Sequence, residues 1–188
     1  MKNVVLTSVI LIAMISITEK SSGQTLPGAD KNWKNELNAQ LPLLGHRNWI
    51  LVVDKAFPAQ TAPGIEVINT GEELLPVLKY TLGQIGQSTH VKPIIYTDKE
   101  LNFISPQLEP RVEAYKKSLS DILHGAEVQT ILHNSVFEKI DEASKLFRIL
   151  VLKTEGTIAY SSVFLQLDCK YWPAEKEKVL REAMNKHD

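Results

Sequence analysis

The chain has 188 residues, a length typical of one domain with a sizeable hydrophobic core. Hydrophobic residues make up 44% of it and charged residues 23%, and the formal net charge of −1 gives no sign of the basic footprint with which proteins bind nucleic acid. The single cysteine, Cys169, excludes an intrachain disulfide and a zinc site of the multi-cysteine type.

Residues 1–23 have the order of a secretory signal peptide. Met1-Lys2 gives a positive start, residues 4–17 form an apolar run, and small residues follow at 21–23. The apolar run is too short for a comfortable membrane span. We therefore expect an exported protein, periplasmic or secreted, with no stable membrane span after cleavage. A retained N-terminal anchor is the alternative.

After a polar linker at 24–31, the chain alternates helices and strands. Apolar runs predict strands at 49–53, 65–68, 93–97, 128–132, 147–152 and 160–167. Helical spacing predicts helices at 33–41, from Glu72 to Leu82, from Pro110 to Gly125, at 135–143 and from Pro173 onward. Strands that are apolar on both faces and alternate with helices predict an α/β fold, a three-layer sandwich with a mostly parallel central sheet. We expect one domain over 32–172 and a C-terminal helical extension over 173–188.

The run from Leu44 to Gln60 carries the first functional signal. His46 precedes the buried strand 49–53 and Asp54 follows it, so a histidine and a carboxylate flank one rigid element. Such groups are suited to proton transfer. The chain has no Gly-x-Gly-x-x-Gly, Walker or Gly-x-Ser-x-Gly motif, so dinucleotide, nucleotide and serine-hydrolase functions lack their usual support.

This run resembles the start of the ribose pyranase and fucose mutarotase family, whose members have a Gly-His pair, a buried strand and an Asp-Ala-x-x-Pro-type loop. The equivalents are Gly45-His46, the strand ending at Val53, and residues 54–59. Three later stretches are similar to the family in the same order. They are 127–133, which ends in His133; Glu142-Ala143 with the strand 148–152; and 156–165, which resembles the closing Tyr-x-Asn strand.

The resemblance, over residues 34–168, implies a monosaccharide mutarotase of the pyranase type. Such an intramolecular isomerase interconverts the anomers or ring forms of a free sugar, such as ribose or fucose, by acid/base catalysis. It implies His46 as the catalytic residue and Asp54, His133, Tyr160 and Ser162 as substrate-binding residues. It implies no cofactor and no metal. It also implies a homo-oligomer with sites at subunit interfaces.

Two positions depart from the family pattern, and each candidate residue has a structural alternative. Lys55 replaces the loop alanine, and Ser162 replaces the asparagine of Tyr-x-Asn. His46 could be structural, Asp54 could cap a turn, His133 could sit at a helix start, and Tyr160 could be a core aromatic. The alternative functions are a non-catalytic carbohydrate-binding protein and a structural oligomer. A sugar site requires His46, Asp54, His133 and Tyr160 to converge on one cavity, within one subunit or across two.

Overall fold

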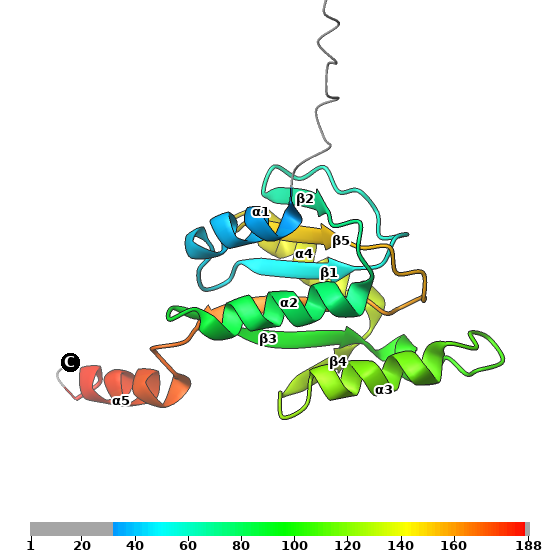
Figure 1. The fold of residues 1–188 in the computed structure, drawn as a ribbon. Helices are drawn as coiled ribbons and strands as arrows, with labels where there is room; N and C mark the ends of the chain where they lie inside the picture. Colours follow the sequence, from blue (N-terminus) through cyan, green and yellow to red (C-terminus); the bar gives the residue numbers. More distant parts are fainter. Residues whose placement is uncertain (1–31, 187–188) are drawn as a thin grey trace, which may run out of the picture. The chain divides into compact units, whose positions relative to one another are not determined.

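A computed structural model describes residues 32–186, which form a six-stranded sheet in the order β2-β5-β1-β6-β3-β4 (Figure 1). The strands are β1 (Trp49–Val53), β2 (Ile65–Asn69), β3 (Val91–Asp98), β4 (Val128–Ile131), β5 (Ile149–Lys153) and β6 (Val163–Cys169). β2, β5 and β1 pair in parallel, as do β3 and β4. β6 lies between β1 and β3 and is antiparallel to both. The prediction of a mostly parallel sheet is confirmed.

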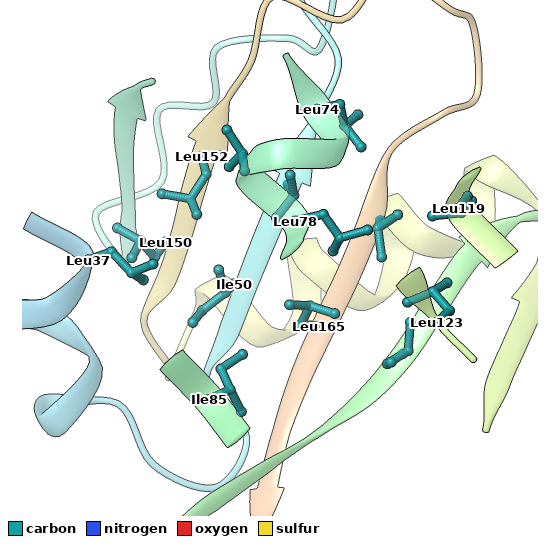
Figure 2. Close-up of a cluster of buried hydrophobic side chains, with 14 of the residues drawn as sticks. Leu37, Ile50, Leu74, Leu78, Ile85, Leu119, Leu123, Leu150, Leu152 and Leu165 are labelled. Carbon is teal, nitrogen blue, oxygen red and sulfur yellow. The ribbon is translucent and has the colours of Figure 1, made fainter. Parts of the chain in front are cut away.

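Three helices cover one face of this sheet, namely α1 (Trp33–Gln40), α2 (Leu74–Gln87) and α3 (Val112–Ile122). Their apolar side chains meet alternate residues of the central strands, such as Ile50 of β1 and Leu165 of β6. Figure 2 shows this cluster, with Leu78 and Ile85 of α2 above the strands. Two short 3-10 helices, η1 (Leu41–Leu43) and η2 (Lys99–Phe103), follow α1 and β3.

The opposite face is covered by α4 (His133–Ser144). Val136 and Ile140 of this helix are fully buried against the other side of β1, where Leu51 points. Because successive strand residues face opposite sides, a strand buried on both faces must be apolar throughout, as β1 is. The predicted three-layer sandwich is therefore confirmed.

Two element boundaries differ from the sequence predictions in ways that matter for the site. The predicted strand 160–167 begins only at Val163, because Tyr160 adopts a left-handed backbone with φ of 58° that no strand accommodates. The predicted strand 128–132 ends at Ile131, and His133 is already the first residue of α4. The helix predicted to begin at residue 135 begins at His133, so Ser135 lies inside it.

The last helix, α5 (Ala174–Met184), buries none of its residues and lies apart from the sheet in Figure 1. The predicted signal peptide at 1–23, the linker at 24–31 and the final residues 187–188 lie outside the described residues. Within residues 32–186, no helix combines the length and the apolar character needed to cross a bilayer.

Candidate functional site at one edge of the sheet

The strand order brings polar residues from four neighbouring strands to one edge of the sheet. Asp54 follows β1, Asp98 ends β3 and His133 comes two residues after β4, so all three lie at carboxyl ends of parallel strands. Ser162 directly precedes β6, whose antiparallel direction places its start at the same edge. Ligand sites in open α/β sheets form at this edge, beyond the carboxyl ends of the strands.

Ser162 holds Asp54 in a fixed orientation. The Ser162 hydroxyl donates to Oδ2 of Asp54 at 2.8 Å and accepts from the Asp54 backbone N–H at 3.1 Å. The other carboxylate oxygen of Asp54 accepts from the backbone N–H of Ala56 at 2.9 Å. Ser162 is buried, and its hydroxyl is used within the protein. The structure thus places the predicted substrate-binding serine as a support for Asp54.

His133 is held by two carboxylates, one on its side chain and one on its backbone. Nδ1 of His133 lies 2.9 Å from Oδ2 of Asp98, and the Asp98 side chain is completely buried. The His133 backbone N–H donates to both carboxylate oxygens of Glu100 at 3.1 Å, which caps α4 from η2. The ring therefore has one defined place at the edge of the sheet.

Burial governs the charge of Asp98. It raises the pKa of this carboxyl to about 6, although the positive charge of His133 and its hydrogen bond act in the opposite direction. The negative charges of Glu100 and Asp54 add to the increase. Asp54 and His133 are therefore both close enough to act on the same buried carboxyl.

Tyr160 stands at the mouth of this cluster. Its ring meets that of His133 edge to face at a centroid distance of 5.2 Å, and its side chain is partly exposed. The ring of Phe137 contacts His133 in the same way at 4.9 Å. The left-handed backbone of Tyr160 costs free energy that the surrounding structure must offset, a pattern that occurs often at functional sites.

A cavity of about 340 Å³ opens beside Asp54. It is lined by residues 54–56 and by the loop 157–159 that leads to Tyr160. Lys55, the residue that replaces the loop alanine, forms an ion pair with Glu155. Behind the cluster, the Tyr115 hydroxyl donates to the Ser161 carbonyl at 2.5 Å, and burial raises the pKa of this phenol.

His46 lies at the opposite end of the strands from Asp54, before the start of β1. Its Nδ1 is 3.0 Å from Oδ1 of Asp168 at the end of β6, and its Nε2 accepts from Nε of Arg47 at 3.1 Å. The side chain is half exposed and lines a separate cavity of about 560 Å³. Because β1 is extended, its two ends are roughly 13 Å apart at ~3.3 Å per residue, so His46 and Asp54 of one protomer cannot act on the same atom.

The sequence patterns did not identify Asp98 as a site residue. Its signal is the same as that of Asp54, an acidic residue that ends an apolar strand, here after Ile94-Ile95-Tyr96-Thr97. The pairing with His133 requires β3 and β4 to be neighbours, with Asp98 opposite Ile131. Within residues 32–186, no group of three or more His, Cys, Asp or Glu side chains could hold a metal ion.

No protein-family model and no curated protein matches the chain. Among solved structures, it is similar to Bacillus subtilis RbsD complexed with D-ribose, with 19% identity, a TM-score of 0.49, and coverage of 70% of this chain and 89% of that chain. It is similar to the Streptococcus pneumoniae fucose mutarotase in complex with L-fucose, with 18% identity, a TM-score of 0.49, and coverage of 75% and 96%. It is also similar to FucU from Bifidobacterium longum, with 18% identity, a TM-score of 0.48, and coverage of 70% of this chain and 92% of that chain.

Proposed function

We propose that the protein is a monosaccharide mutarotase that interconverts the anomers or ring forms of a free sugar, such as ribose or fucose, by acid/base catalysis. The observation that carries this proposal is the gathering of Asp54, Tyr160 and the His133–Asp98 pair at the carboxyl edge of the sheet, next to a cavity. The motif resemblance supports the same chemistry.

Mutarotation needs one proton removed and one supplied. Nε2 of His133 takes the proton of the anomeric hydroxyl, and the electron pair of that O–H bond forms the aldehyde carbonyl. The bond between the anomeric carbon and the ring oxygen breaks, its electrons go to the ring oxygen, and this oxygen takes a proton from a protonated imidazole. Closure on the opposite face of the carbonyl reverses both transfers, so neither group is consumed. Imidazole suits both tasks because it titrates near neutral pH.

Asp54 and Tyr160 orient the sugar. Asp54 carries a carboxylate held by Ser162 and Ala56, and its oxygens accept hydrogen bonds from sugar hydroxyls. The Tyr160 hydroxyl both donates and accepts, and its side chain is accessible. A sugar held between these groups presents its anomeric carbon to the neighbouring imidazole.

The second proton-transfer group in this proposal is His46 of a second copy of the chain. Within one protomer His46 and Asp54 lie at opposite edges of the sheet, so a site that uses both needs two subunits. His46 is exposed, and Asp168 orients its ring through Nδ1. Arg47 bonds to Nε2, so this contact has to open before that nitrogen transfers a proton. A homo-oligomer with interfacial sites would bring His46 of one copy to Asp54, His133 and Tyr160 of another.

The test is the exchange of anomers measured by NMR saturation transfer with a panel of free aldoses that includes D-ribose and L-fucose. We expect the wild-type protein to accelerate exchange for at least one sugar, and Asp54→Asn and His46→Ala each to reduce the effect by about 10²-fold or more. Asp121→Asn, which removes an exposed carboxylate from α3, serves as the charge-matched control and should retain the rate.

A second candidate function is non-catalytic carbohydrate binding, and Ser162 favours it. Its hydroxyl is occupied by Asp54, so it offers the ligand fewer donors than the carboxamide of the family pattern would. Calorimetric binding that Asp54→Asn abolishes, without any acceleration of exchange, would support this alternative. A wild-type protein that neither binds nor converts any sugar in the panel would contradict both functions.

A further inference from the structure

The Asp98 carboxyl is the one charged group among the buried polar residues that the structure describes. Its side chain has no exposed surface, and one of its oxygens, Oδ1, is buried without a hydrogen-bond partner within residues 32–186. The other oxygen, Oδ2, has His133 Nδ1 as its partner. A buried carboxylate with one unpaired oxygen is costly, so a fold that keeps it there gains from its charge or its hydrogen bond.

Groups from four elements surround this carboxyl. His133 on α4 makes a hydrogen bond with it, the charges of Glu100 on η2 and Asp54 after β1 act on it, and its own charge acts on Tyr115 of α3. Only His133 can bring a positive charge. Any stabilisation of an ionised Asp98 by these neighbours therefore comes from the imidazole, and the two groups are linked electrostatically.

We propose that Asp98 is a positioning residue that fixes His133 in the tautomer with the proton on Nδ1. In that tautomer Nε2 carries the free lone pair, and no hydrogen bond within the described residues occupies it. When Nε2 takes a proton, the buried anion stabilises the resulting imidazolium at 2.9 Å. This inference rests on the proposed mutarotase function, but its first consequence concerns the histidine ring alone.

Glu100 makes the assignment to Asp98 more specific. Glu100 binds the backbone N–H of His133 and fixes where the residue begins the helix, but it does not touch the ring. Phe137 and Tyr160 contact the ring through their faces and edges and cannot choose between its two nitrogens. The choice of tautomer therefore falls to Asp98.

The test combines a spectroscopic and a kinetic measurement on the full chain. With ¹⁵N-labelled histidine, the His133 signals, identified by their loss in His133→Gln, should show the Nδ1–H tautomer in the wild type above the titration range. In Asp98→Asn, where the amide can donate to Nδ1, the Nε2–H tautomer should grow in. For the sugar that is converted, the saturated exchange rate should fall by about 10²-fold or more, with a much smaller change in KM.

Asp141→Asn is the matched control, because it removes an exposed carboxylate from the same helix and should change neither readout. A wild-type His133 in the Nε2–H form would overturn the proposal even if Asp98→Asn failed to fold. So would an Asp98→Asn variant with the wild-type tautomer or the wild-type exchange rate. If no sugar is converted but the tautomer changes as expected, the function proposed above fails while the positioning of His133 by Asp98 stands.

Discussion

The Ser162 hydroxyl makes two hydrogen bonds to the same residue, Asp54, as donor to its carboxylate and as acceptor from its backbone. The contact joins the end of β1 to the start of β6, in the middle of the proposed site. A hydroxyl is short, so Ser162 can reach Asp54 only because the two strands are neighbours in the sheet. What looks in the sequence like a weakened sugar contact is in the structure a support for the principal carboxylate.

Removing this support should lower the stability of the fold. We expect Ser162→Ala to lower the free energy of unfolding by about 1–3 kcal/mol, since it leaves the Asp54 backbone N–H without its acceptor. Urea denaturation would measure the loss. Ser118→Ala, on the exposed surface of α3, provides the control. An unchanged midpoint in Ser162→Ala would show that water replaces the hydroxyl without loss.

Asp98 should make stability depend on pH. Its pKa rises from 3.8 to about 6 on folding, so the folded state binds this proton more tightly than the unfolded chain does. The stability from this proton is fully present below the unfolded pKa and is lost as the pH rises through the folded pKa.

The unfolding free energy of the wild type minus that of Asp98→Asn should accordingly decrease as the pH rises from about 4 to about 7. Denaturation curves for both proteins across this range would measure it. A difference that is constant, or that grows with pH, would contradict the raised pKa.

At the scale of elements, the turn into β2 brings two backbone segments into close contact. A Cβ added to Gly64 would lie 2.7 Å from the Ser144 carbonyl oxygen and 2.8 Å from that of Phe147. Both are backbone atoms at the end of α4 and before β5, and Gly64 itself accepts from the Ile149 N–H. Glycine is needed here for close approach between two backbones.

Gly64→Ala should therefore destabilise the protein by about 1–3 kcal/mol, because the backbone has to move to admit a methyl group. Gly83→Ala is the matched comparison. Gly83 lies within α2, and its added Cβ would meet nothing within 4 Å, so alanine should stabilise the helix by about 1 kcal/mol. Thermal unfolding should therefore show a lower midpoint for Gly64→Ala and a higher one for Gly83→Ala than for the wild type.

The elements also show what local sequence can and cannot predict. Continuous apolar runs predicted β1 and β5 because burial on both faces allows no polar residue there. Tyr160 is compatible with a strand in sequence, but it adopts a left-handed backbone and β6 begins only at Val163. Asp98 was missed because its partner is 35 residues away on another strand, and strand order is not a local property. That His46 and Asp54 lie at opposite edges follows from the direction of β1 alone.

At the scale of the whole molecule, one protomer carries the residues of the proposed site in two separate groups, at opposite ends of the sheet's strands. The carboxyl edge has Asp54 and His133, and the other edge has His46 with Asp168. A closed ring of identical subunits, in which one edge of each meets the other edge of the next, would complete every site.

This arrangement predicts complementation between inactive variants. His46→Ala and Asp54→Asn, refolded together in equal amounts, should regain about one quarter of wild-type activity, because random mixing makes about one site in four from two intact halves. Anomer exchange measures the recovery, and analytical ultracentrifugation measures assembly. A mixture that assembles but stays as inactive as its parents would contradict a site shared between subunits.

The position of β6 has a consequence for the order of events in folding. This strand is the last one along the chain, and yet it lies inside the sheet, where it joins the β2-β5-β1 group to the β3-β4 pair. Until residues 163–169 are available, both groups have an unpaired inner edge of apolar strands, β1 and β3. The sheet therefore depends on contacts that are distant in sequence, which slow folding. Ser162 can bond to Asp54 only once β6 has paired with β1. A chain that lacks this final strand would therefore have neither a complete core nor the proposed site.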